Sequence, residues 1–265
     1  GIQGAALATV LSYVTSSIWV VSYFFSKRSR LKLKFSNMTL DKQRVIKIIK
    51  IGFPTFVIQV TSSIQQLILN RSLGKYGGND ALAIIGVIMN VTTFLVMPAM
   101  GIGQGAQPIF GYNKGAKQDK RVKETLIYSL ISATVIIFIG FLVAKIWPYQ
   151  IFSLFSKSEE LIENGVYAMN IFFKFIPLVG VQMIASNYFQ AIGKSNQATI
   201  LGLSRQVFLF IPIILILPYV WGLDGAWWSA PVSDLAAFIL TGVWLFIEVR
   251  KESQTEEEQK DLYKN

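Results

Sequence analysis

The chain has 265 residues, of which 52% are hydrophobic and 15% are charged, and its net charge is +10. Soluble domains have about a quarter of their residues charged, so much of this apolar surface must face lipid or other buried helices. Cysteine and histidine are both absent, which removes disulfides, thiolate chemistry and the commonest general base. The composition therefore predicts an integral membrane protein. It argues against an enzyme, because general acid–base and metal chemistry lack their usual residues.

Seven segments are long and apolar enough to cross a bilayer, which takes about 20 mostly apolar residues in a helix. They are uninterrupted apolar runs without the alternation of a transmembrane β-strand. The sequence therefore predicts an all-α fold, a polytopic transmembrane helix bundle. The seven segments are residues 2–25, 51–73, 80–106, 125–147, 163–191, 198–220 and 226–247.

Lysine and arginine concentrate in two connections, residues 26–50 with nine and residues 111–124 with five. Cytoplasmic loops of membrane proteins are enriched in these residues, so both connections and the tail, residues 248–265, are expected in the cytoplasm. The positive charge is then explained by the cytoplasmic position of these loops, and we expect no nucleic-acid partner. Seven spans also place Gly1 outside without a signal peptide. We therefore expect a fragment that lacks an odd number of N-terminal spans.

The two polar stretches at the ends of the apolar region leave alternatives open. The second half of residues 26–50 has apolar residues spaced for an amphipathic helix at the membrane surface, or is a solvated connector. Its apolar residues are Leu40, Val45, Ile46, Ile48 and Ile49. The tail has too few apolar residues to fold alone, which predicts disorder or a frayed helix.

A dense motif closes the third apolar segment, with the pattern G-x-x-Q-G-x-Q-P-I-x-G-Y-N-x-G-A-K over residues 101–117. Part of it imitates a dinucleotide-binding turn, but a membrane span precedes it where that turn requires a strand. Small residues at this spacing favour close helix packing instead. The glycines and Asn113 at its end predict a helix stop.

The ordered set of short motifs resembles bacterial multidrug and toxic compound extrusion (MATE) transporters. Besides residues 101–117, the resemblance rests on residues 1–9, 51–54, 76–78, 188–194, 205–206 and 231–234. It implies twelve spans in two six-helix lobes. Residues 1–25 would then be the last helix of the N-lobe, 26–50 a basic inter-lobe linker, 51–247 the six-helix C-lobe and 248–265 a cytoplasmic tail.

The resemblance also implies a function. It is an H⁺- or Na⁺-coupled antiporter of the bacterial cytoplasmic membrane that exports drugs or other cationic or amphiphilic small molecules by alternating access. A flippase for lipid-linked oligosaccharide, from the same broad superfamily, is the alternative. It would need basic residues in its cavity to neutralise pyrophosphate. The expected partners are the lipid bilayer, a small-molecule substrate and the N-lobe of the same chain.

Polar residues inside the apolar segments are candidates for the substrate cavity, because such groups cost free energy unless they find partners or water. In residues 51–73 they recur at intervals of three and four, which places them on one helical face. The face either lines a wet cavity or packs against a neighbouring helix. The candidates are Gln59, Ser62, Ser63, Gln66 and Asn70, with Asn90 and Gln104 in the next segment.

Three charged residues lie deep in the apolar segments, Lys174, Arg205 and Asp234. Their depths, at 1.5 Å per helical residue, favour an ion pair between Lys174 and Asp234, with Arg205 reaching Asp234 only when fully extended. Pro177 is expected to bend the helix that carries Lys174. The pair either responds to ion or substrate binding, or is a static neutralised pair.

We expect no resident cofactor or metal. Coupling to H⁺ or Na⁺ needs a carboxylate that can be protonated or can supply hard oxygen ligands. Asp234 is the deep carboxylate of this sequence, and it is expected to face a cation already. The principal coupling site is therefore expected in the N-lobe.

Overall fold

The computed structural model describes residues 2–26, 29 and 41–262. Among these residues the secondary structure is helical, with no strand, which confirms the all-α prediction. The chain divides into two compact units, residues 1–53 and residues 54–265. We call the described part of the second unit, residues 54–262, the bundle.

The first unit contains α1 (Ile2–Phe25), a 24-residue helix that is about 36 Å long at 1.5 Å per residue. Most of its described side chains are exposed, including those of Trp19 and Tyr13. The hydroxyls of Ser12 and Thr15 donate hydrogen bonds to the carbonyl oxygens of Ala8 and Leu11, one turn earlier. Polar side chains thus find partners within the helix itself, as an apolar solvent requires.

The helix α2 (Lys42–Gly115) begins inside the predicted connection of residues 26–50. Residues 42–50 are therefore helical, and Ile46, Ile48 and Ile49 are exposed. The helical conformation of residues 42–50 is compatible with the amphipathic-helix alternative, which stays a prediction. Leu40 lies outside the described residues.

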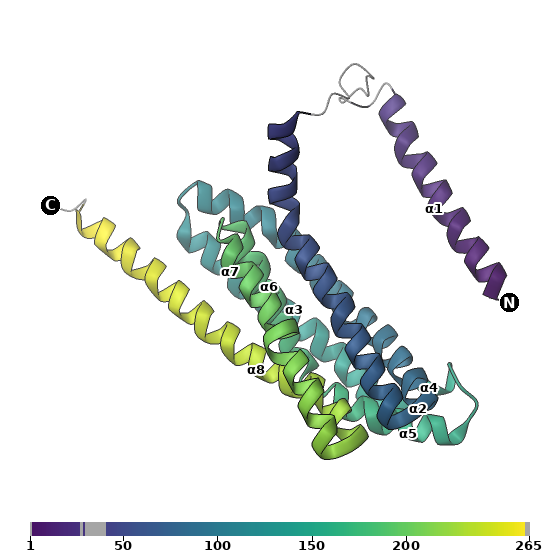
Figure 1. Ribbon diagram of the computed structural model, residues 1–265. Coiled ribbons are helices and arrows are strands. Elements are labelled where there is room, and N and C mark those ends of the chain that lie inside the picture. The colour runs from purple at the N-terminus through teal and green to yellow at the C-terminus, as the bar shows by residue number, and fades with distance from the viewer. Residues whose placement is uncertain (1, 27–28, 30–40, 263–265) are drawn as a thin grey trace. The chain divides into compact units, whose positions relative to one another are not determined.

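The bundle is a series of helices that run back and forth, as Figure 1 shows. After α2 come α3 (Asp119–Ile146), α4 (Pro148–Ser153), α5 (Glu159–Phe172), a 3₁₀ turn η2 (Ile176–Leu178), α6 (Val179–Ala191), α7 (Ser195–Leu203), a π-helix η3 (Ser204–Phe210) and α8 (Ile211–Leu262). The last helix extends through the predicted tail to Leu262, which agrees with the helical alternative for that segment.

Two glycines divide the longest helices into separate arms. The apolar part of α2 has 60 residues, about three times the length that crosses a bilayer. It is interrupted at Gly78, whose φ of 66° and ψ of −154° lie in a region open to glycine. Gly222 interrupts α8 in the same way, with φ 59° and ψ −134°. The chain reverses direction at both positions (Figure 1).

One further crossing segment consists of two helices joined at a bend. Helices α5 and α6 meet at 45° across a short break, and Pro177 lies in η2 at this break, as predicted. When α2 and α8 are divided at their glycines and this pair is counted once, the described residues contain the seven predicted crossing segments. The predicted helix stop is also confirmed, since α2 ends at Gly115 and Lys117 has a φ of 57°.

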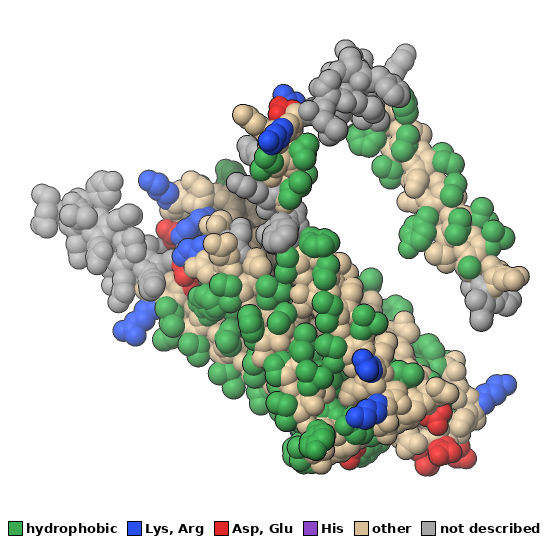
Figure 2. Space-filling model, in the orientation of Figure 1, with side chains coloured by type: hydrophobic (Ala, Val, Ile, Leu, Met, Phe, Trp, Pro, Cys, Tyr) green, Lys and Arg blue, Asp and Glu red, His purple; other side chains and the backbone are tan. Residues whose placement is uncertain are grey.

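The surface of the bundle matches a membrane environment. Figure 2 shows hydrophobic side chains over its middle and charged side chains gathered toward its two ends. The interior is also apolar and close-packed. Phe110 of α2 contacts Tyr188 of α6 edge to face, with ring centroids 5.5 Å apart. A Cβ at Gly180 would lie 3.3 Å from the backbone of Ala133, so a small residue lets α6 approach α3 closely.

Candidate functional site

An ion pair between η3 and α8 lies within the bundle. The Nε of Arg205 donates a hydrogen bond to Oδ1 of Asp234 over 2.8 Å. The Asp234 side chain is 8% exposed and that of Arg205 is 38% exposed, so the carboxylate is buried and the guanidinium is its accessible half. Arg205 belongs to a π-helix, and such wide turns occur frequently at functional sites.

The expected Lys174–Asp234 pair is wrong. Lys174 lies in the break between α5 and η2, and its Nζ is 4.5 Å from the centroid of the Trp228 ring. Trp228 precedes Asp234 by six residues on α8, which is about 9 Å along a helix axis. Depth alone could not reveal this difference, because it does not give the rotation of a side chain about its helix.

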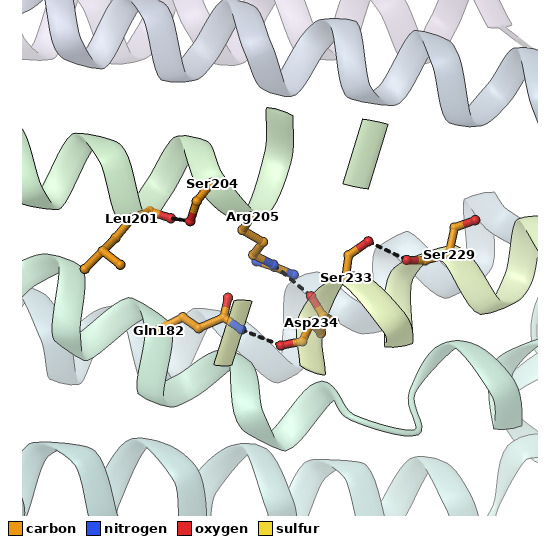
Figure 3. Close-up of polar contacts among 7 residues, drawn as sticks. All are labelled: Gln182, Leu201, Ser204, Arg205, Ser229, Ser233 and Asp234. Atoms are coloured by element: carbon orange, nitrogen blue, oxygen red, sulfur yellow. Dashed lines mark hydrogen bonds and ion pairs between the residues drawn. The ribbon is translucent and has the colours of Figure 1, made fainter. Parts of the chain in front are cut away.

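Gln182 of α6 holds the backbone next to this pair. Its Nε2 donates a 2.9 Å hydrogen bond to the backbone carbonyl of Asp234, as Figure 3 shows. The residue is 8% exposed, and its Oε1 is buried without a hydrogen-bond partner in the described part of the chain. Buried polar atoms are normally paired, so this oxygen is an unsatisfied acceptor in the packed interior beside the ion pair.

Hydroxyls around the pair are bonded to backbone carbonyls of their own helices. Ser233 donates to the carbonyl of Ser229 over 2.6 Å, and Ser204 donates to that of Leu201 over 2.8 Å (Figure 3). These bonds use up the hydroxyl donors. The donors that remain near the pair therefore belong to the guanidinium of Arg205 and to neighbouring amide side chains.

A first cavity of about 450 Å³ opens beside the ion pair, between both arms of α2 and the helices α5, α6, η3 and α8. Its walls mix apolar side chains with hydroxyls, amides and the two charged residues. Four of the six methionines of the chain line this cavity. The lining residues are Ser62, Gln65, Gln66, Leu69, Met89, Thr92, Thr93, Val96, Met97, Met100, Phe172, Ile176, Val179, Met183, Arg205, Phe210, Ala230, Ser233 and Asp234.

A second cavity of about 390 Å³ shares Met100, Met183 and Arg205 with the first. Two thioethers and the guanidinium therefore lie where the cavities meet. The second cavity is more polar, with amide side chains on several walls. It is lined by Ile58, Met100, Gln104, Gln182, Met183, Ser186, Asn187, Leu201, Gly202, Arg205 and Gln206.

The structure separates the predicted cavity candidates into two groups. Ser62 and Gln66 line the first cavity, and Gln104 lines the second. Ser62 also donates a hydrogen bond to Oε1 of Gln206 over 3.2 Å. The other four predicted residues, Gln59, Ser63, Asn70 and Asn90, are exposed on the bundle and are not part of the lining of either cavity.

Those four residues make local contacts. Asn70 accepts a hydrogen bond from Gln66 over 2.9 Å, Ser63 donates to the carbonyl of Gln59, and Asn90 donates to that of Gly86. Sequence reasoning missed Gln182, which lies beside the ion pair. The rule that a polar residue inside an apolar segment is a candidate would have found it.

Two of the sequence motifs are in contact in the bundle. Nε2 of Gln107 donates to Oε1 of Gln190 over 2.8 Å, which joins residues 101–117 to residues 188–194. Lys194 forms an ion pair with the buried Glu248. A Cβ at Gly103 would collide with the side chain of Asn187. The motifs thus support close packing between α2, α6 and α8.

An all-helical bundle with an apolar surface and polar cavities inside it defines the chain as a multi-pass membrane protein. The sequence model of the MatE family matches residues 54–216. The chain belongs to the MatE family, and its relatives place it in a bacterial membrane.

Among curated proteins, the chain is similar to multidrug export protein MepA of Staphylococcus saprophyticus. The two are 27% identical over 244 residues, which are 90% of this chain and 53% of the relative. MepA of Staphylococcus haemolyticus is 27% identical over 262 residues, 97% of this chain and 57% of the relative. The chain therefore spans about half the length of these curated relatives.

Solved structures agree with the family. The MATE multidrug transporter DinF-BH in complex with rhodamine 6G is 36% identical, with a TM-score of 0.77 over 93% of this chain and 55% of that one. An inward-facing MATE transporter of the MOP superfamily matches with a TM-score of 0.85 at 22% identity, over 95% of this chain and 59% of that one. The second likeness shows the fold alone.

Proposed function

We propose that the chain is the C-lobe and the last N-lobe helix of a cation-coupled antiporter, which exports drugs or other amphiphilic small molecules by alternating access. The observation that carries the proposal is the first cavity. Its volume of about 450 Å³ lies in the range of ligand pockets, about 300–1,000 Å³. Family membership and the multidrug export function named for the MepA relatives support the same activity.

The composition of the cavity suits varied ligands. Methionine side chains are flexible and polarisable, and they adapt to ligands of different shape. Met89, Met97, Met100 and Met183 supply this kind of wall. Hydroxyls and amides such as Thr93 and Gln66 add hydrogen-bonding groups.

Coupling to H⁺ or Na⁺ is proposed to rest mainly on the N-lobe of the same chain. Of the acids that the structure describes, Asp234 lines a cavity, and its charge is already paired with Arg205. We propose that this pair is static. A second lobe would supply a free carboxylate and close the substrate chamber.

The flippase alternative finds less support. Neutralising pyrophosphate requires several basic groups, and Arg205 is the basic residue among the described lining residues of both cavities. Lys174, the other deep base, lies over Trp228 and lines neither cavity. One guanidinium is a poor match for two phosphates.

Transport by the full-length protein in proteoliposomes tests the proposal. Rhodamine 6G is the dye probe, since it is the ligand of the DinF-BH complex. We expect dye movement when an H⁺ or Na⁺ gradient is imposed, and loss of movement when the gradient is collapsed with an ionophore. Turnover of a lipid-linked oligosaccharide with no movement of dye would favour the flippase instead.

A further inference from the structure

We propose that Arg205 joins the two cavities into one site for amphiphiles that carry a single carboxylate. The carboxylate would lie in the second cavity against the guanidinium, and the apolar body would lie in the first. This inference rests on the proposed function and names a substrate class for it. It differs from the expectation of cationic substrates because it follows from the charges that line these cavities.

The guanidinium is the available charge at the junction of the cavities. In the described part of the chain only its Nε is bonded, to Asp234, so both Nη groups remain as donors. The planar fork of a guanidinium matches a carboxylate in a two-point contact. Because Asp234 is the more buried partner, the pair presents its cationic half to a ligand.

The second cavity suits an anionic head group. Its described lining contains Arg205 and no acid, so the like charge that a carboxylate there would meet is that of Asp234, which is bonded to Nε of the same guanidinium. Amide side chains of Gln104, Asn187 and Gln206 surround the remaining space and can donate further hydrogen bonds.

Gln182 fixes the position of the Asp234 backbone beside this site. In Figure 3 its side-chain oxygen points away from the carbonyl of Asp234, toward the side of Leu201 and Arg205. This Oε1 is buried without a partner among the described residues, and Gln182 lines the second cavity. The oxygen is shielded from the cavity, so the part of Gln182 that a ligand can touch is the rest of its side chain.

The first cavity suits the apolar body of such a ligand. Phe172, Phe210 and the methionines offer aromatic and thioether surface, and sulfur–aromatic contacts are favourable. Met100 and Met183 line both cavities, so a flexible boundary separates the head-group space from the body space.

A cation gains little from these walls. The charge of Asp234 is already balanced by Arg205, and Asp234 is the acid among the described residues that line the first cavity. A preference for cations would have to come from the other lobe, whereas in the bundle the exposed half of the neutral pair is the guanidinium.

A matched pair of dyes tests this selection. Rhodamine 6G is a cationic ethyl ester, and its free acid has the same ring system with a carboxylate in place of the ester. Both would be titrated by fluorescence polarisation against the full-length protein in lipid nanodiscs. We expect the wild type to bind the acid about tenfold more tightly than the ester, the effect of a charge-assisted hydrogen bond.

Three variants assign the preference to Arg205. The double variant Arg205→Gln, Asp234→Asn removes both charges together, and we expect it to bind acid and ester equally. Asp234→Asn alone removes the negative charge that balances the guanidinium and is expected to increase the preference for the acid. Arg205→Lys keeps the charge but loses the fork, so the preference should fall several-fold while the protein stays folded. Thermal melting of each variant checks its folding.

Equal binding of the two dyes by the wild type, or an unchanged preference in the double variant, would overturn the inference. Gradient-driven movement of rhodamine 6G, measured separately, tests the proposed function. Transport of rhodamine 6G without tighter binding of the acid would therefore contradict only the carboxylate site. Tighter binding of the acid that depends on Arg205, without transport of either dye, would contradict only the proposed function.

Discussion

Arg205 and Asp234 meet over 2.8 Å from two different helical segments, and the carboxylate is far more buried than the guanidinium. The pair lies where two cavities join, since Arg205 lines both. Its position makes it both a structural tie between η3 and α8 and the main electrostatic feature of the site. These two roles can be separated by substitution.

Removing one partner of the pair should destabilise the protein. Arg205→Ala leaves a buried carboxylate without its cation, and we expect a loss of about 3 kcal/mol, at the lower end for a broken buried pair because Arg205 is partly exposed. A lower midpoint of thermal unfolding in detergent would report it. Lys174→Ala is the matched control, since an exposed cation–π contact contributes at most about 1 kcal/mol. Equal melting of the two variants would contradict the prediction.

The location of the helices could be predicted from the sequence, whereas the partner of Asp234 could not. A bilayer demands long apolar runs and internal backbone hydrogen bonds, so the spans, the bend at Pro177 and the stop at Gly115 are visible as local patterns. The pairing of Asp234 depends on rotation about helix axes. The π-helix that carries Arg205 changes this rotation, and the sequence contains no signal for it.

The cavity lining was predictable only in part, for a related reason. A polar face on residues 51–73 is visible from spacing, but the neighbour that each position meets depends on the other helices. Ser62 and Gln66 point to cavity positions, while Gln59 and Ser63 on the same segment do not. Gln182 was visible as a polar residue in an apolar run, yet its unsatisfied acceptor follows only from the fold.

The reversal in α2 depends on glycine at position 78. Its φ of 66° and ψ of −154° are closed to residues with a side chain, so Gly78→Ala should cost about 1–3 kcal/mol. Gly86→Ala in the same helix is the matched control, because it has a helical backbone and open space around its Cβ position. There alanine should be neutral or stabilising by up to about 1 kcal/mol. Melting temperatures distinguish the two variants. An unchanged unfolding midpoint for Gly78→Ala would show that the reversal does not require glycine.

The methionine wall should contribute to dye binding. Met183→Leu keeps the volume but loses the thioether at the boundary of the two cavities, and we expect the affinity for rhodamine 6G to fall about two- to tenfold. Met169→Leu is the control, since Met169 is buried in the core and lines neither cavity. Titration of the full-length protein with rhodamine 6G measures both. The same loss in both variants would point to a general packing effect in place of a direct contact.

The ion pair should not control energy coupling. If Arg205 and Asp234 form a static pair, Asp234→Asn leaves the dependence of transport on H⁺ or Na⁺ unchanged, because the charge that responds to the ion lies elsewhere in the full-length protein. Initial rates of dye movement in proteoliposomes, measured against the size of the imposed gradient, test this. Transport by the variant that no longer responds to either gradient would show that Asp234 takes part in coupling. The variant retains a hydrogen-bond acceptor for Arg205, so a simple loss of the contact would not account for that result.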